Sequence, residues 1–315
     1  MPTRLSLGSY VLYDVDSGDV LAAKDPYGLY RPASVIKILL VMVALDELDM
    51  DQRVRVTEEM ANVDGSKVGV GPGGKYTAEQ LLQGLVMNSG NDAALALAGA
   101  LGGTDATVAK MQALADSLGV RATRVTTVNG LDTPDAQTTA YDLALVYRAA
   151  FQRADVRKLL GTGQATFPGF GENPAFRIAS DNGLLHAYPG TLGGKTGFTD
   201  NARHTYAAAV SRRGRTLGVV MLNSTIAAGR PWEQAATVFD AAFDAPRDAS
   251  VGRLVDAADT AGAADSTGTA AAVPAGAAET SGTDGAASTT VVAVIVAAVV
   301  CVLAAGAWLF LRRRR

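Results

Sequence analysis

Alternating apolar and polar residues mark two groups of strands on either side of a long middle region. Residues 9–14 and 20–23 alternate around Asp16-Ser17-Gly18, a pattern that is typical of a β-hairpin. Later stretches rich in β-branched and small apolar residues predict three more strands, at 195–199, 204–211 and 216–223. Because helical patterns lie between the two groups, we expect an α+β fold in which both ends of the domain build one antiparallel sheet around a helical insertion.

The middle region has the apolar spacing of helices. Thr77 is followed by Gln80 at the third helical position, which predicts a capping box and a helix that runs to about Met87. The same reasoning from spacing and end signals predicts helices at 34–48, 92–101, 105–118, 140–160 and 232–243.

The globular pattern stops well before the end of the chain. Residues 257–290 are rich in Ala, Gly, Thr, Ser and Asp and contain almost no large apolar side chain. Such a stretch cannot bury enough surface to fold. We therefore expect a catalytic or binding domain over 1–247 and a flexible tether over 248–290.

Residues 291–311 carry no charge and are followed at once by four arginines, Arg312 to Arg315. As a helix this stretch would span about 31 Å, which matches a bilayer core, so a transmembrane helix is favoured over a buried core helix. The arginines predict a cytoplasmic C-terminus and an extracytoplasmic domain. Residues 1–7 contain no apolar stretch long enough for a signal peptide, so we expect an export signal upstream of Met1.

Composition removes several classes of function. A net charge of −3 with scattered basic residues argues against a nucleic-acid partner. Cys301, the single cysteine, lies in the predicted span, which excludes an internal disulfide and disfavours a thiol nucleophile. The two histidines, His186 and His204, have no zinc-ligand spacing, so we expect neither a metal nor another cofactor.

Ser34-Val35-Ile36-Lys37 is the first candidate for chemistry. Residues three apart on a helix share a face, with Cβ atoms about 5–6 Å apart. A serine hydroxyl needs a base, and a lysine can be that base if burial or a nearby cation keeps it neutral. The motif alone is weak because many solvated helix faces carry it, but here the surrounding residues are apolar.

Two further short motifs carry polar groups of the right kind. Ser89-Gly90-Asn91, between two predicted helices, could provide a proton relay and an amide contact. A turn that ends one helix and caps the next would also explain these residues. Lys195-Thr196-Gly197 lies on a predicted strand, where a cation beside a hydroxyl can bind a carboxylate and the glycine leaves room for a substrate backbone. The non-functional interpretation of this motif is an edge strand whose lysine disfavours pairing with another chain.

Together the three motifs have the order of the penicillin-interacting serine enzymes. The residues around them resemble the low-molecular-mass D-alanyl-D-alanine carboxypeptidases, serine peptidase family S11, over about residues 9–245. The resemblance implies a serine β-lactamase/DD-peptidase-like fold with peptidoglycan stem peptides as substrate and β-lactams as inhibitors. The similar segments are 32–37, 89–94, 129–131, 182–185 and 194–199.

The resemblance also implies a role for each catalytic residue. Ser34 would attack the carbonyl between two D-alanines, and Lys37 would take its proton. Ser89 would pass a proton to the leaving D-alanine, while Asn91 would hold a substrate amide. The product would be a stem peptide that has lost its terminal D-alanine, released by water from an acyl-enzyme.

Substrate binding would fall to the third motif and its surroundings. Lys195 and Thr196 would bind the terminal carboxylate, and Gly197 would let the substrate backbone approach. The backbone N–H groups of Ser34 and Phe198 would form an oxyanion hole. Arg230 lies at a spacing where a further cation near the carboxylate is expected.

Three alternatives stay open on the sequence. A serine β-lactamase would need a glutamate to hydrolyse the acyl-enzyme quickly, and Glu172 lies between the second and third motifs, although its context does not resemble the expected loop. A non-catalytic peptidoglycan sensor would bind without turnover, which the three intact motifs argue against. An endopeptidase acting inside cross-links would not need a free carboxylate.

Overall fold

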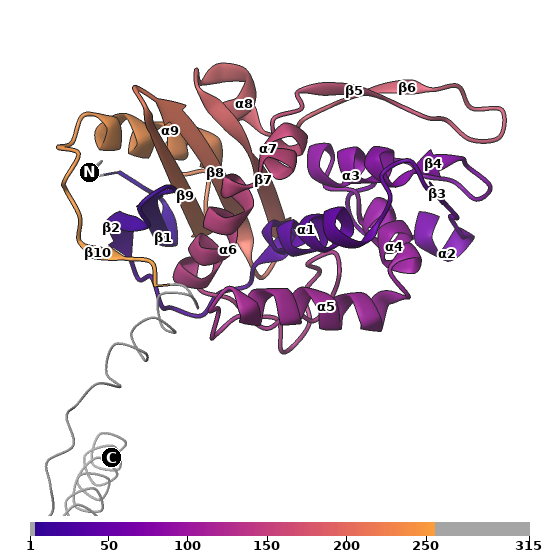
Figure 1. Cartoon of the computed structure of the whole chain (residues 1–315), viewed down its shortest axis with the longest axis horizontal. Coiled ribbons are helices and arrows are strands. Elements are labelled where there is room, and N and C mark those ends of the chain that lie inside the picture. The colour runs from indigo at the N-terminus through magenta and orange to yellow at the C-terminus, as the bar shows by residue number, and fades with distance from the viewer. Residues whose placement is uncertain (1–3, 256–315) are drawn as a thin grey trace, which may run out of the picture. The chain divides into compact units, whose positions relative to one another are not determined.

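A six-stranded antiparallel sheet forms the centre of the computed structural model, which describes residues 4–255 (Figure 1). Its strand order is β10-β2-β1-β9-β8-β7, so strands from the two ends of the described chain pair side by side. The first hairpin turns at Gly18, as predicted, and β1 pairs on its other side with β9. The strands of this sheet are β1 (Leu7–Asp14), β2 (Asp19–Lys24), β7 (Thr191–Thr199), β8 (Arg203–Arg212), β9 (Arg215–Ser224) and β10 (Gly252–Arg253).

Both faces of the sheet are buried, which explains why its central strands are almost continuously apolar. On β9, for example, Val219 and Met221 face one apolar cluster and Val220 and Leu222 face the other. Helix α9 (Pro231–Phe243) covers the first face, and α6 (Ala140–Gln152) lies against the second (Figure 1).

The helical insertion extends from the second face of the sheet (Figure 1). The capping box is present as predicted, with Thr77 and Gln80 reciprocally bonded at the start of α3. The remaining helices are the 3-10 turn η1 (Ala33–Ile36), α1 (Lys37–Glu47), α2 (Glu58–Ala61), α3 (Ala78–Met87), α4 (Asn91–Ala100), α5 (Thr104–Ser117), α7 (Ala154–Leu160) and α8 (Gly183–Ala187).

The structure confirms the α+β fold with a sheet built from both ends of the domain, and it corrects details. The helix expected at 140–160 is two helices, because Arg153 between them is extended, with φ −83° and ψ 128°. Helix 34–48 opens as the 3-10 turn η1. Two small two-stranded sheets were not predicted, formed by β3 (Arg53–Val54) with β4 (Tyr76–Thr77) and by β5 (Gln164–Phe167) with β6 (Phe176–Ala179).

The domain extends beyond residue 247, where we expected it to end. β10 pairs with β2, and Leu254 is completely buried, so the first residues assigned to the tether belong to the fold. The rest of the tether, the predicted span at 291–311 and the arginines at 312–315 lie outside the described residues. Within residues 4–255, no helix has both the length and the apolar character needed to cross a bilayer.

Candidate active site

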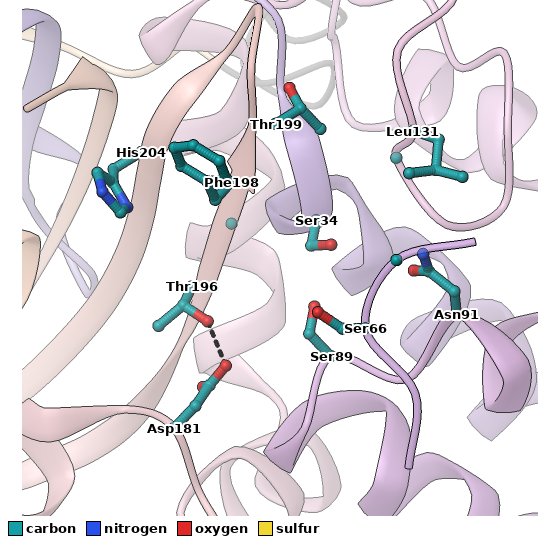
Figure 2. Close-up of a pocket in the computed structure, with 13 residues that line it drawn as sticks. Ser34, Ser66, Ser89, Asn91, Leu131, Asp181, Thr196, Phe198, Thr199 and His204 are labelled. Atoms are coloured by element: carbon teal, nitrogen blue, oxygen red, sulfur yellow. Dashed lines mark hydrogen bonds between the residues drawn. The ribbon is translucent and has the colours of Figure 1, made fainter. Parts of the chain in front are cut away.

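A cavity of about 600 Å³ opens between β7, at the edge of the sheet, and the helical insertion (Figure 2). Ser34 lies between the side chains of β7 on one side and Ser66, Ser89 and Asn91 on the other. All three sequence motifs therefore meet at one place. The cavity is lined by Ser34, Gly65, Ser66, Ser89, Asn91, Gly130, Leu131, Asp181, Thr196, Gly197, Phe198, Thr199 and His204.

Ser34 is held at the cavity by η1, whose first residue has an unusual backbone. Ala33 is buried and has φ +48°, a left-handed conformation that costs energy for a residue with a Cβ and persists where the surroundings enforce it. Gly130 packs directly on this turn, because a Cβ there would overlap the Ala33 carbonyl oxygen. The segment Asn129-Gly130-Leu131 thus shapes the backbone that carries Ser34.

Lys37 begins α1 one turn after Ser34 and points back to it. Its Nζ lies 2.6 Å from Ser34 Oγ, so the two groups that the sequence predicted as base and nucleophile are in hydrogen-bond contact. The Lys37 side chain is completely buried.

Two more oxygens surround the amine of Lys37. Asn91 Oδ1 lies 2.8 Å away and the Asn129 carbonyl oxygen 2.7 Å away, and both atoms can only accept hydrogen bonds. The orientation of the Asn91 amide follows from its Nδ2, which donates to the Asp64 carbonyl at 2.7 Å. A neutral amine has two N–H groups and one lone pair, so the two acceptors use the N–H groups and the lone pair faces the Ser34 hydroxyl.

The electrostatics of the site favour this neutral amine. Burial lowers the pKa of Lys37 well below the ordinary value of 10.5, and the Lys195 cation lowers it further. The carboxylates of Asp181 and Asp92 act in the opposite direction on the same pKa without overcoming the burial.

The second motif forms the tight turn between α3 and α4. Ser89 lines the cavity and has φ +56°, a second strained residue at this site. The Asn91 backbone N–H donates to the Ser66 carbonyl at 2.7 Å, which ties the turn to the facing loop. Because the Asn91 amide contacts Lys37 and Asp64, its first role in the free protein is to position the base. The contact with a substrate amide stays a prediction.

Lys195, in the third motif, is buried in β7 and donates to the Thr196 carbonyl oxygen at 2.8 Å. Burial lowers the pKa of Lys195, and the nearby Asp181 carboxylate opposes that shift. Thr196 and Phe198 both reach the cavity. β7 is the edge of the described sheet, so an extended peptide can lie along its outer side.

The structure gives a different reason for a glycine at position 197 from the one that we predicted. A Cβ at this position would lie 2.9 Å from the backbone nitrogen of Ser34 and would overlap the Thr205 hydroxyl. The absent side chain therefore lets β7 pack against the turn that carries the nucleophile, and it brings the Ser34 N–H next to the strand. Room for the substrate is a further consequence that stays a prediction.

Two carboxylates were missed by sequence reasoning. Asp181 lines the cavity and accepts a hydrogen bond of 2.6 Å from Thr196 Oγ1 (Figure 2). Asp92 is completely buried and accepts from the backbone N–H groups of residues 68, 69 and 70. Asp181 lies next to the segment 182–185, and Asp92 lies within the segment 89–94. Both segments were singled out in the sequence, and that was the only signal available.

Arg230 and Glu172 lie away from Ser34. Arg230 lies immediately before α9 and lines a neighbouring cavity of about 460 Å³ that shares Asp181, Thr196, Gly197 and His204 with the first. Glu172 is exposed in the loop between β5 and β6 and does not line the cavity, so the glutamate considered for a β-lactamase is not in position. In the described part of the chain, no group of three or more His, Cys, Asp or Glu residues could hold a metal ion.

Comparisons with known proteins agree on one family. The sequence model of the family described as D-alanyl-D-alanine carboxypeptidase matches residues 2–225. The chain is 44% identical over 250 residues to the D-alanyl-D-alanine carboxypeptidase DacB2 of Mycobacterium tuberculosis, covering 78% of this chain and 85% of that protein. It is 33% identical to the D-alanyl-D-alanine carboxypeptidase DacF of Bacillus subtilis, covering 69% of this chain and 57% of that protein.

Solved structures show the same relationship. The crystal structure of a D-alanyl-D-alanine carboxypeptidase from Mycobacterium tuberculosis H37Rv superposes with a TM-score of 0.76 at 43% identity, covering 81% of this chain and 97% of that one. The Streptomyces K15 DD-transpeptidase superposes with a TM-score of 0.73 at 25% identity, covering 78% of this chain and all of that one.

Proposed function

The chain belongs to the S11 family of D-alanyl-D-alanine carboxypeptidases, and from this premise we propose how its own residues carry out the reaction. It is a serine DD-carboxypeptidase that acts on peptidoglycan. One observation supports the assignment of roles above all others: the buried amine of Lys37 lies 2.6 Å from the hydroxyl of Ser34, at the wall of an open cavity.

In the acylation step, the lone pair of Lys37 Nζ takes the proton of the Ser34 hydroxyl. Ser34 Oγ then attacks the carbonyl carbon of the amide between the two terminal D-alanines. The N–H groups of Ser34 and Phe198 stabilise the oxyanion, and donors arranged in advance are often the largest contribution to acyl transfer. The close packing of Gly197 on Ser34 supports this pairing because it brings the strand and the turn together.

The acyl-enzyme forms when the amide C–N bond breaks. The leaving D-alanine nitrogen takes a proton through Ser89, which lines the cavity opposite β7. Lys195 and Thr196 bind the terminal carboxylate of the substrate, with Arg230 adding positive charge from the neighbouring cavity. Water then hydrolyses the Ser34 ester, which releases the shortened peptide and returns the proton to the hydroxyl. β-Lactams acylate Ser34 in the same way.

Ser34→Ala tests this assignment directly. We expect it to abolish both labelling by a fluorescent penicillin and release of D-alanine from a D-Ala-D-Ala pentapeptide, followed by mass spectrometry. Ser117→Ala, at the exposed end of α5, is the control and should retain both. Covalent labelling that persists in Ser34→Ala would refute the nucleophile, and rapid loss of label from the wild type would favour a β-lactamase.

We also propose that residues 291–311 anchor the protein in the cell membrane, with the catalytic domain outside and the C-terminus in the cytoplasm. The support is the uncharged stretch followed by Arg312 to Arg315. The full chain should sediment with membranes and resist alkaline extraction, whereas a chain that ends at residue 255 should not. A full chain found in the supernatant would contradict the anchor.

A further inference from the structure

The carboxylate of Asp181 lies inside the group of residues that is proposed to receive the carboxylate of the substrate. Thr196 Oγ1 donates its hydrogen bond to Asp181 Oδ2 at 2.6 Å, which is a short, charge-assisted contact (Figure 2). A hydroxyl has a single proton to donate. In the free protein, therefore, the Thr196 donor is already used by a carboxylate of the protein itself.

Asp181 also stands where the two cavities meet. It lines the cavity of Ser34 and the neighbouring cavity of Arg230, and both cavities share Thr196 with it. A substrate carboxylate that approaches Lys195 and Thr196 must come close to the Asp181 carboxylate. Two like charges about 4 Å apart repel by about 1 kcal/mol in water and by several times more near a protein surface.

We propose that Asp181 is a specificity-determining residue that competes with the terminal carboxylate of the substrate for Thr196. The inference rests on the proposed role of Lys195 and Thr196 as the carboxylate receptor. Binding of a free acid requires Thr196 to leave Asp181, whereas binding of a peptide with an uncharged end does not. Asp181 therefore reduces the preference of this protein for a free carboxylate over a blocked chain end.

Asp181 has a second effect that acts in the opposite direction. Its charge helps to keep Lys195 protonated against the burial that lowers the pKa of that lysine. In the complex with a free acid, however, the carboxylate of the substrate supplies the same support to Lys195. The competition for Thr196 therefore decides the net effect on binding of a free acid.

Asp181→Asn is the sharpest test, because it keeps the size of the side chain and an acceptor for Thr196 while removing the charge. The full chain is assayed on a D-Ala-D-Ala peptide and on the same peptide with an amidated C-terminus. We expect KM for the free acid to fall about tenfold with kcat changed by less than about twofold, while kcat/KM for the amide stays within about twofold. Asp181→Ala, which also removes the acceptor, should lower KM for the acid at least as much.

Asp16→Asn is the matched control, since it makes the same change in net charge at an exposed hairpin turn outside both cavities. It should leave both peptides unaffected. An unchanged KM for the free acid in both Asp181 variants would overturn the inference. So would a rise in that KM, because it would show that the main effect of Asp181 is to hold Lys195 charged.

Failure of the proposed function would give a different experimental result from failure of this inference. A wild type that cleaves neither peptide would contradict the carboxypeptidase mechanism itself. The effect of Asp181→Asn is then measured on the rate of acylation by benzylpenicillin, which also carries a carboxylate. A faster rate at low penicillin concentration would support the competition at Thr196, and an unchanged rate would overturn it.

Discussion

At the residue scale, two buried lysines next to the cavity have opposite requirements: Lys37 must be neutral to act as base, and Lys195 must be charged to bind a carboxylate. Below the pKa of Lys37 the base has no lone pair, so kcat/KM should rise as the pH increases through that pKa. Above the pKa of Lys195 the receptor loses its charge, so kcat/KM should fall again. Because both pKa values are lowered, both limbs should lie below 10.5, and a pH profile with the free-acid peptide measures them.

The amidated peptide is the control for this profile. It does not need a charged Lys195, so its profile should keep the acid limb and lose the alkaline limb. Lys37→Arg should lower kcat/KM at neutral pH by about 1,000-fold, because a guanidinium stays protonated and cannot be a base. A free-acid profile that shows neither an acid limb nor a fall below pH 10.5 would contradict both roles.

Sequence reasoning at this scale found the residues that carry a motif and missed those that act through tertiary contacts. Ser34 and Lys37 lie together as their spacing predicted, and the third motif joins them as the family resemblance implied. The Asn129 carbonyl contacts Lys37 through a backbone atom, which no side-chain pattern can reveal. The contact of Asp181 with Thr196 depends on how the segment before α8 packs on β7, so the identity of the residue alone gave no signal.

At the scale of elements, Asp92 joins α4 to the loop that forms one wall of the cavity. Its carboxylate accepts hydrogen bonds of 2.7–3.0 Å from the N–H groups of Val68, Gly69 and Val70, and the side chain is completely buried. Asp92→Ala leaves three backbone donors without this partner, two of them in the buried residues Val68 and Val70. We expect the free energy of unfolding to fall by about 3–4 kcal/mol in urea denaturation, since each of the two buried hydrogen bonds to this carboxylate contributes about 1.5 kcal/mol or more and the third, from the exposed Gly69, contributes less. kcat/KM should fall as well, because the turn with Ser89 and Asn91 loses its support.

Asp105→Ala is the matched control for Asp92→Ala. Asp105 also lies in the first turn of a helix, α5, but it is exposed. The general effect of a negative charge at a helix N-terminus is worth about 0.3–1 kcal/mol, so this variant should lose no more than that. Equal losses in the two variants would show that Asp92 acts through the helix dipole and not through the loop.

Elements were predictable where local signals agree with the tertiary structure. The capping box of Thr77 and Gln80 is an example, because both partners lie within one turn. The break between α6 and α7 was not predictable from local preference. Arg153 at the break forms ion pairs with Asp46 at the end of α1 and with Asp155 at the start of α7, both at 2.7 Å. The contact with Asp46 joins residues that are distant in sequence. The helical periodicity of the sequence continues through Arg153, so no local pattern indicates the break.

At the scale of the whole molecule, the pairing of both ends of the domain in one sheet followed from the order of the predicted strands. The last strand did not. β10 is only Gly252–Arg253, and neither residue has the apolar or β-branched character of a strand. Its position comes from pairing with β2 and from the burial of the following Leu254. The residues of β10 therefore gave no local signal that the fold continues past residue 247.

The position of β10 leads to a prediction about where the domain ends. The Val251 N–H donates to the Val20 carbonyl at 2.7 Å, and the Leu254 N–H donates to the Gly18 carbonyl at 2.8 Å. A chain that ends at residue 247 loses these bonds and the burial of Leu254, whereas a chain that ends at 255 keeps them. A buried leucine contributes about 2–3 kcal/mol and each backbone bond about 1 kcal/mol. We expect the shorter chain to be less stable by about 3–5 kcal/mol in urea denaturation.

Leu254→Ala in the chain that ends at 255 separates the two contributions to this loss. It keeps the backbone pairing and removes the buried side chain, so it should account for about 2–3 kcal/mol. Val255→Ala, at an exposed position, should change the stability by less than about 0.5 kcal/mol. β10 and β7 lie at opposite edges of the described sheet, so at low temperature the folded fraction of each chain should retain the kcat/KM of the full chain. Equal urea midpoints for the chains ending at 247 and 255 would show that the domain does end before β10.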